Sequence, residues 1–404
     1  MKYRWLVLFG ALVAVVMMAS VPVAGQAPAA GRTYTAPRTA WGDPDVQGLW
    51  RGLHRVPFER PPQYEGREFL TDAEVAELVR EAEAGQARTL AGLNTSTGFR
   101  NQANYNGIVN YSADPVRFSR RTSAIIDPPD GRLPPWSLEG INRYEAREEA
   151  TLGRGEADSW LDRFYGERCI DVVKTANVGF WGMSLAGEAR TDELAEPGVV
   201  ERPGVEGPRI RNDVTGGRPT RIMQARGYVV ITHEDRATEY QIIPLDRPHL
   251  GPKFKQWMGD ARGHWEGDTL VVETTNIKFP APLIPTYISQ ANGWYPGDGE
   301  TLRITERFMR VGPDTIEYKY TVEDPNVYSR PYTVLHELTR DDAYKVSAEL
   351  CHEGHDDMPS SLAAARVDEE NALEYAAEAR RARAPRLKQL KEGAIKAAEE
   401  KKGR

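Results

Sequence analysis

The sequence predicts a mainly β fold with helical additions, in which an antiparallel meander is closed as a barrel or folded as a sandwich. Residues 218–352 hold a series of short stretches rich in β-branched and aromatic residues, separated by turn signals. The 28 prolines and 36 glycines indicate many turns and few long helices. Closure of the sheet would remove the exposed edges that an open sheet has to protect.

The most regular part of this pattern is residues 301–324, which predict a β-hairpin. Side chains alternate between two faces from Leu302 to Phe308 and again from Ile316 to Val322, on either side of a Gly312-Pro313-Asp314 turn. This period of two is typical of half-buried strands. Further strands are predicted at residues 227–234, 238–245, 267–276, 332–339 and 344–352.

An N-terminal arm and helices are expected to wrap this core. Thr71 and Glu74 form a capping box that starts a helix, and Gly85 is expected to end it. A C-terminal helix that is solvent-exposed or fraying, and broken near Pro385, is expected to carry no chemistry. The predicted regions are a signal peptide (1–27), an extended arm (28–66), a helical and loop-rich wrapping region (67–217), an antiparallel β core (218–366) and a charged helical tail (367–404).

The N-terminus has the pattern of a secretory signal peptide. Lys2 and Arg4 precede an uncharged apolar run, and small residues follow, with cleavage expected after Gly25 or Ala27. The alternative is an uncleaved anchor, because the apolar run is long enough to span a bilayer. We expect a periplasmic or secreted protein with no membrane contact after cleavage. The net charge of −7 argues against a nucleic-acid partner.

The two cysteines are expected to form a disulfide. Period two in the last predicted strand places Cys351 on the outer side and His352 on the apolar side. An exported chain with two cysteines favours a bond from Cys351 to Cys169. The alternative is two free thiols.

Glu306 is the first candidate for catalysis, because it lies on the same predicted face as Leu302, Ile304 and Phe308. An ionisable group on an apolar face is costly unless it is paired or lines a polar cavity. Glu306 or Glu353 would be the general acid or base, with His352 as its partner. The alternative for Glu306 is an ion pair near the rim. His336 has a similar placement, and we interpret it as a satisfied core histidine.

Residues 247–270 are expected to form a long loop at the rim of the sheet, as a lid or binding edge. Tryptophans beside carboxylates and an arginine suit a polar ring or a sugar, with Arg262 as an anion or hydroxyl clamp. The predicted substrate-binding residues are His249, Trp257, Asp260, Arg262 and Trp265. The alternative is a loop tied down by pairing of the Asp260–Arg262 type.

No organic cofactor is expected, because the sequence has no phosphate loop, dinucleotide fingerprint or G-x-S-x-G elbow. A divalent metal is the sharper alternative, held by His352, Glu353 and His249, with His355 or His264 as further ligands. The H-E-G-H spacing differs from the H-E-x-x-H motif of zinc peptidases. We therefore predict no metal site.

Several segments resemble a widespread group of exported bacterial proteins of uncharacterised function. These are PLDRPHL, QWMGDARGHWEGDTLVVETTN, LRITERF, DTIEYKYTVEDP and CHEG, and the similarity spans roughly residues 120–366. The resemblance implies no particular activity. His264 and His355 depart from the residues usual in the group, which weakens the metal alternative. The positions that match the group are His249, Asp260, Arg262, Glu306, His352 and Glu353.

Two classes of function follow. The first is a periplasmic enzyme of hydrolase or lyase type that acts on a small organic or carbohydrate-like molecule by acid/base chemistry. The second is a non-catalytic ligand-binding or structural β-domain. Convergence of Glu306, His352 and the 257–268 segment on one cavity would favour the enzyme, and their separation would favour the second class.

Overall fold

The computed structural model describes residues 34–93, 117–151, 219–234, 238–278, 297, 299–345, 359, 362–363 and 372–402. The predicted signal peptide, both cysteines and His352, Glu353 and His355 lie outside these residues. Among the described helices, none is long and apolar enough to cross a bilayer.

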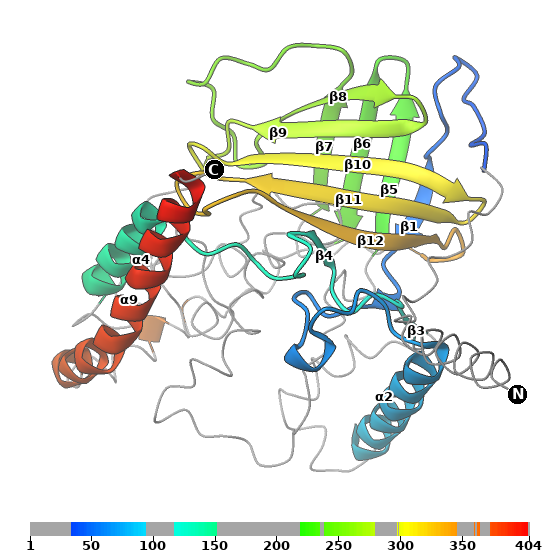
Figure 1. The fold of residues 1–404 in the computed structure, drawn as a ribbon. Coiled ribbons are helices and arrows are strands. Elements are labelled where there is room, and N and C mark those ends of the chain that lie inside the picture. The colour runs from blue at the N-terminus through cyan, green and yellow to red at the C-terminus, as the bar shows by residue number, and fades with distance from the viewer. Residues whose placement is uncertain are drawn as a thin grey trace, which may run out of the picture. The chain divides into compact units, whose positions relative to one another are not determined.

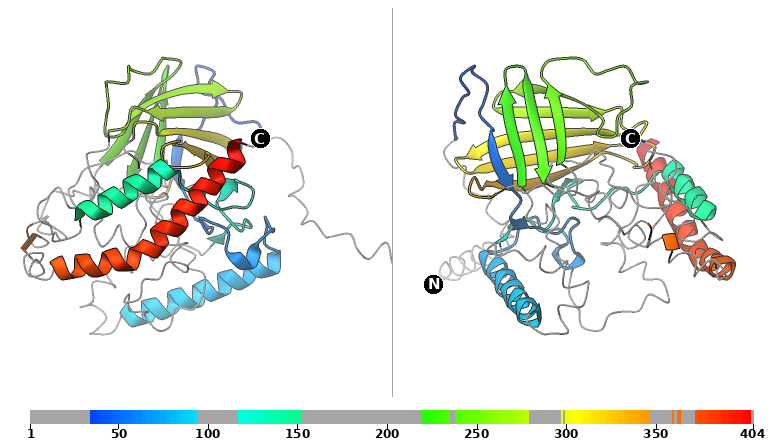
Figure 2. Two further views of the ribbon diagram at one scale, coloured as in Figure 1. Left: turned by 60° about the vertical axis from the view of Figure 1, so that its left-hand side comes forward. Right: turned by 180° about the vertical axis from the view of Figure 1, so that it is seen from behind.

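A large antiparallel sheet, nearly closed as a barrel, forms the core, as the sequence predicted (Figure 1). Nine of its strands follow the order β7-β6-β5-β1-β12-β11-β10-β9-β8. In Figure 1, β8 to β12 form the wall nearest the viewer, and Figure 2 shows β5, β6 and β7 from behind. The strands are β1 (Gly48–Arg51), β5 (Pro219–Ala225), β6 (Tyr228–Glu234), β7 (Thr238–Pro244), β8 (Asp260–Glu266), β9 (Thr269–Thr275), β10 (Arg303–Gly312), β11 (Thr315–Glu323) and β12 (Tyr332–Arg340).

The two ends of this sheet, β7 and β8, meet at a junction that we call the seam. Every neighbouring pair in the order above is antiparallel, so strand direction reverses at each step. Because the order contains nine strands, its first and last members, β7 and β8, run in the same direction. At the seam Leu245 and Gly263 form a single parallel bridge, and the backbone N–H of Asp246 donates to the Gly263 carbonyl at 2.8 Å. The segment 245–259 connects the two strands, because parallel neighbours cannot be joined by a tight turn.

The N-terminal arm is part of the barrel wall rather than only a docked extension. Its strand β1 lies between β5 and β12 and pairs with both. Trp50 on β1 is fully buried, and its indole N–H donates to the carbonyl of Val46 at 3.0 Å.

The short strand β4 (Ile125–Asp127) pairs with the other half of β12. A separate parallel pair joins β2 (His54–Arg55) to β3 (Arg117–Phe118).

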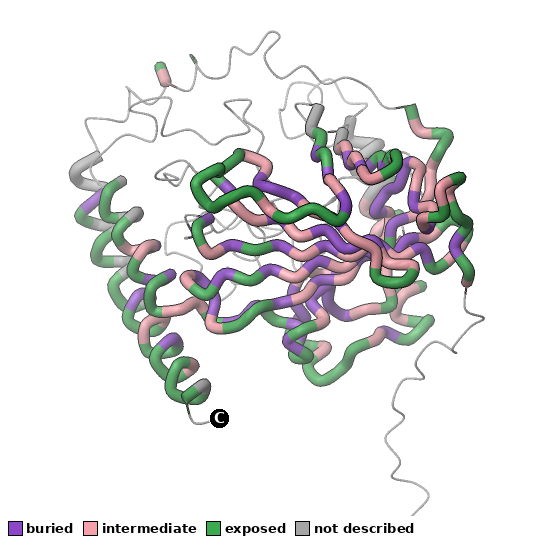
Figure 3. The backbone as a smooth tube through the Cα atoms, turned by 90° about the horizontal axis from the view of Figure 1, so that it is seen from above, coloured by how far each residue is buried: buried purple, intermediate pink, exposed green. Residues whose placement is uncertain are grey.

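The barrel core lies on the inner faces of the strands, where buried and partly exposed residues alternate (Figure 3). Strand register aligns these residues into rows across β8 to β12. The first row is Trp265, Leu270, Phe308, Tyr318 and His336, and the second is Gly263, Val272, Glu306, Tyr320 and Val334. These rows contain most of the polar groups discussed below.

The helices differ from the predictions at their ends. Helix α2 (Asp72–Leu93) has the predicted capping box, with the Thr71 N–H donating to Glu74 Oε2 at 2.7 Å and the Glu74 N–H donating to Thr71 Oγ1 at 3.3 Å. It continues past Gly85, so the predicted end was wrong, because one glycine costs a helix only about 1 kcal/mol. A 3-10 turn, η2 (Pro62–Tyr64), precedes it.

The C-terminal helix α9 (Ala372–Lys402) packs beside α4 (Leu138–Thr151). Leu387 and Ala394 are buried against Ile141 and Tyr144. Two ion pairs flank this contact, Lys391–Glu145 at 2.6 Å and Arg380–Glu149 at 2.7 Å. The helix continues through Pro385, so the predicted break was wrong, and among its described residues only Ala376, Leu387 and Ala394 are buried hydrophobics.

Two strands of the predicted core region 218–366 were not expected from the sequence, and one of them had been predicted as a loop. Residues 260–266, expected as part of a lid, form β8, and residues 219–225 form β5. The inward residues of β8 include Ala261 and Gly263, so no run of large apolar side chains marks the strand. From residue 346 onward, the predicted strand 344–352 lies outside the described residues.

The first prediction concerns Gly263, whose missing side chain lets β7 approach β8. A Cβ atom at Gly263 would lie 2.7 Å from Leu245 Cδ2 and 2.9 Å from Ile243 Cγ2. We expect Gly263→Val to lower the free energy of unfolding by about 1–3 kcal/mol, the usual cost of overpacking. Urea denaturation measures this. Gly312→Ala is the control, because a Cβ there lies 3.7 Å from Thr315 and meets no tight contact. Equal stability of Gly263→Val and the wild type would contradict this account of the seam.

Candidate functional site

Glu306 lies inside the barrel, on the face that it shares with Ile304 and Phe308, as the alternation of side chains along the strand predicted. It is 2% exposed, and the Tyr318 hydroxyl donates a hydrogen bond to its Oε1 at 2.7 Å. Glu306 pairs in register with Tyr320, so the two side chains are neighbours in one inner row. A carboxylate is thus held by a phenol in a low-dielectric interior, where its interactions with other charges and dipoles are strong.

Aromatic rings surround this carboxylate. The rings of Phe308 and Tyr318 stack with centroids 4.8 Å apart, and those of Tyr318 and Tyr320 lie 5.8 Å apart. The Tyr320 ring in turn stacks on the His336 imidazole at 6.2 Å. One column of rings therefore runs across β10, β11 and β12 on the inner face.

His336 is buried as predicted, but it is not a satisfied core histidine. It is 5% exposed, and neither Nδ1 nor Nε2 has a hydrogen-bond partner among the described residues. Burial lowers its pKa from 6.5 to about 3, so the imidazole is neutral near pH 7. The prediction assumed that a buried histidine finds a partner, which is the rule for buried polar groups and is broken here.

The Tyr320 hydroxyl is a second buried polar group without a hydrogen-bond partner in this part of the barrel. Burial, and then the neighbouring Tyr328 and Glu306, raise the pKa of Tyr320 well above 10, so it is un-ionised at all ordinary pH values. The tyrosines were missed as site residues, because a strand tyrosine reads as part of the apolar alternation. Their position opposite Glu306 in the hairpin register was the available signal.

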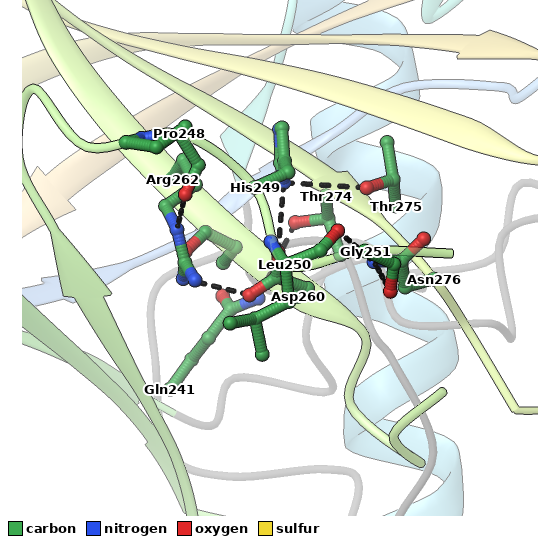
Figure 4. A network of polar contacts seen from close by, with 11 residues as sticks. Gln241, Pro248, His249, Leu250, Gly251, Asp260, Arg262, Thr274, Thr275 and Asn276 are labelled. Carbon is green, nitrogen blue, oxygen red and sulfur yellow. Dashed lines mark hydrogen bonds and ion pairs between the residues drawn. The ribbon is translucent and has the colours of Figure 1, made fainter. Parts of the chain in front are cut away.

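A separate polar network lies on the outer face of β8 and is centred on Asp260 (Figure 4). The Asp260 side chain is 1% exposed. Its Oδ1 pairs with Arg262 Nη1 at 2.7 Å, and its Oδ2 lies 3.0 Å from His249 Nδ1 and accepts the Leu250 N–H at 2.7 Å. Both oxygens of the carboxylate are therefore occupied by the protein itself.

The same network ties the segment 245–259 to the barrel. Arg262 donates from Nε to the Pro248 carbonyl at 2.8 Å, and the Asn276 amide donates to the Leu250 carbonyl at 3.0 Å (Figure 4). Inside the barrel, Gln241 of β7 donates to Thr274 of β9 at 3.3 Å. These contacts match the alternative reading, a loop held down by Asp260–Arg262 pairing, and Arg262 as an anion clamp would first have to leave them.

The two predicted tryptophans lie in different surroundings. Trp265 of β8 packs against the barrel core, and its buried indole N–H has no partner among the described residues. Its row also contains Tyr318 and His336. Trp257 lies in the segment before β8, where Lys278 Nζ is 5.0 Å from its ring centroid.

The structure therefore brings together His249, Asp260 and Arg262 at the seam, and places Glu306 on the other face of the sheet. Trp265 belongs with Glu306, in the neighbouring inner row. His352, Glu353, Cys169 and Cys351 lie outside the described residues. Among the described residues, no group of three His, Cys, Asp or Glu side chains is placed to hold a metal ion.

Comparisons with protein-family models, with curated proteins and with solved structures found no match to this chain.

The second prediction tests the seam network. Asp260→Asn keeps the shape of the side chain but leaves Arg262, with a side chain 15% exposed, without its counter-charge. Breaking a buried pair in this way costs about 3–5 kcal/mol, so we expect a loss of this order in the free energy of unfolding. The control is Asp268→Asn, because Asp268 pairs with Arg38 on the surface and exposed pairs contribute about 0–1 kcal/mol. Equal effects of the two substitutions in urea denaturation would contradict the assignment.

The third prediction concerns His336 and pH. The folded-state pKa of about 3 lies below the unfolded value of 6.5, so only the unfolded chain takes up this proton between these values. Stability from this group is therefore full above pH 6.5 and is lost as the pH falls toward 3. We expect His336→Gln to flatten the acid side of the stability profile, measured by urea denaturation at pH steps from 7 to 4.

Asp324 contributes to the pH dependence of stability with the opposite sign, so the variant has to be compared with the wild type. Burial raises the pKa of Asp324 from 3.8 to about 6, so the folded chain binds the extra proton and stability falls as the pH rises through this window. The wild-type profile sums both groups, whereas the difference between wild type and His336→Gln isolates the histidine. An unchanged slope in the variant would show that His336 is protonated in the folded state.

Proposed function

We propose that this chain is an exported protein that binds a small organic molecule inside its β-barrel, with Glu306 as a polar anchor. The observation that supports this most directly is a carboxylate, 2% exposed, on the inner face among aromatic rings. A buried carboxylate costs free energy, and a purely structural barrel would be filled more cheaply by apolar side chains. An ionisable group buried among apolar side chains is therefore a candidate for a functional site.

The inner face offers both parts of a typical small-molecule site. Such sites are mostly apolar and aromatic, with a few convergent polar groups that fix orientation. Here the aromatic part is Phe308, Tyr318, Tyr320 and Trp265, and the fixed polar part is the Glu306–Tyr318 pair. A barrel of about eight strands has an interior that is either filled by its side chains or holds one small ligand.

The seam supports a route to this interior. Elsewhere around the barrel order, neighbouring strands pair at two or more positions, whereas β7 and β8 are joined by the single bridge between Leu245 and Gly263. Strand β12 is the middle strand of the nine, so its inward side chains lie across the barrel from the seam. A ligand that entered between β7 and β8 would therefore meet the wall that carries His336.

A second candidate is an enzyme of hydrolase or lyase type, with Glu306 as the general acid or base. The hydrogen bond of 2.7 Å between Tyr318 and Glu306 favours it, because such a pair can orient the carboxylate and exchange a proton with a bound molecule. His352 and Glu353 remain its predicted partners. Its weakness is that the predicted binding residues His249, Asp260 and Arg262 are engaged on the outer face.

The fourth prediction uses Glu306→Gln, which removes the charge and keeps the shape. We expect a screen of small sugars, phenols and aromatic amides to give compounds that raise the melting temperature of the wild-type chain, and the variant to lose this shift. Glu323→Gln is the matched control, because Glu323 lies exposed at the end of β11. A screen without hits, or hits that bind Glu306→Gln and wild type equally, would reject the proposal.

The same proteins separate the two candidates. If the chain is an enzyme, wild type should hydrolyse 4-nitrophenyl esters or glycosides, and Glu306→Gln should be slower by about 100-fold or more. Ligand binding without turnover assigns the binding function alone. Activity that is lost with EDTA and unaffected by Glu306→Gln would point instead to the metal alternative.

A further inference from the structure

His336 and Tyr320 form a pair of buried polar side chains that the described structure leaves without hydrogen bonds. His336 is 5% and Tyr320 1% exposed, and three of their polar atoms, Nδ1, Nε2 and the hydroxyl oxygen, have no partner among the described residues. Their rings are stacked with centroids 6.2 Å apart. The two groups therefore share one place on the inner face.

This pair is expensive in the ligand-free protein. Each buried polar group that loses water without gaining a partner costs of the order of a broken hydrogen bond. Native structures contain few such groups, and each calls for an explanation by a ligand, a solvent molecule or a functional role. Here Tyr320 pairs in register with Glu306, and His336 lies on the same wall in the neighbouring inner row, opposite Tyr318.

Tyr318 shows that the barrel can satisfy a phenol on this face, although Tyr332 and Trp265 also carry buried polar atoms without a partner among the described residues. Tyr318 is on the same strand and the same face as Tyr320, two residues away, and its hydroxyl is bonded to Glu306 at 2.7 Å. The chain thus satisfies one phenol and leaves the next one free. The free phenol is the one stacked on the unpartnered imidazole.

We propose that His336 and Tyr320 form a subsite that binds the uncharged, planar, hydrogen-bonding group of a ligand, such as an amide or a lactam ring. The inference rests on the proposed function, since it names the ligand class for the same interior. A neutral imidazole presents one donor and one acceptor, and a phenol can act as either. A planar group with both a donor and an acceptor satisfies these atoms while its face packs against the ring column.

Charge excludes the other ligand classes. The carboxylate of Glu306 shares an inner row with Tyr320 and lies one row from His336, where it repels an anion, and an ion of either sign would lose its water against a neutral imidazole. A purely apolar ligand would leave the same three atoms unsatisfied. The subsite therefore selects for a molecule that is polar without being charged.

The test compares four probes of nearly the same size: benzamide, benzoate, benzamidine and toluene. They differ in charge and hydrogen bonding, and binding is measured on the full-length chain by thermal shift and calorimetry. We expect benzamide alone to bind, and to shift the imidazole ¹⁵N resonances of His336. We expect Tyr320→Phe and His336→Phe each to weaken benzamide binding at least tenfold, whereas Glu323→Gln leaves it unchanged.

Stability without ligand gives an independent result. Tyr320→Phe removes an unpartnered hydroxyl and should keep or raise the melting temperature, by up to about 2–4 °C. Tyr318→Phe is the matched control and should lower it, since it removes the bond to Glu306. If His336→Phe fails to fold because the larger ring overpacks the barrel, Tyr320→Phe carries the test alone, because it removes a single atom.

Several outcomes would overturn the inference. A fall in melting temperature for Tyr320→Phe equal to that for Tyr318→Phe would show that the Tyr320 hydroxyl is satisfied in the folded chain. Binding of benzoate or benzamidine in preference to benzamide would refute the ligand class, as would failure of all four probes. Benzamide binding that is lost in Glu306→Gln and intact in both Phe variants would reject the subsite and leave the proposed function standing.

Discussion

The parity of the strands is the constraint on which the rest of the structure depends. Nine strands, each antiparallel to its neighbour in the order, cannot close without one parallel junction, and the chain places this junction between β7 and β8. A parallel junction forces a long connection, and that connection has to be fixed to the barrel. Asp260 fixes it from outside through Arg262, His249 and the Leu250 N–H, and Gly263 admits the side chains of β7 from inside.

This constraint explains which parts of the fold the sequence could predict. The bounds of the β10–β11 hairpin and of β12 were predicted nearly to the residue. One face of each of these strands is buried and the other is more exposed to solvent, so apolar and polar side chains alternate along the sequence. Strand β8 was mistaken for a loop, because its inward residues at the seam are small and its outward residues Asp260 and Arg262 are charged. The strand therefore lacks the alternation of large apolar and polar residues that identifies a strand in a sequence. Strand β1 was read as an arm, since a pairing across more than 160 residues, such as Trp50 with Thr220, leaves no local pattern.

The candidate site also has features that local alternation predicts and features that depend on contacts between distant residues. Alternation alone placed Glu306 inside the barrel, but it could not show that Tyr318 holds the carboxylate, because that contact joins two strands diagonally. The dense group of His249, Asp260 and Arg262 looked like a binding loop, since structural ion-pair networks use the same residue types as binding sites do. Only the saturation of both Asp260 oxygens by the protein's own groups separates these readings, and saturation is a property of three-dimensional contacts.

The inner wall shows the opposite condition, and the contrast between the two networks carries the functional argument. At the seam, burial of a charge is matched by partners on every side, which is what a structural role requires. On β11 and β12, the imidazole of His336 and the hydroxyl of Tyr320 are buried without any described hydrogen bond. A folded chain gains nothing from such groups by itself, so their place next to Glu306 is understandable if the free energy is recovered when a molecule with matching donors and acceptors binds.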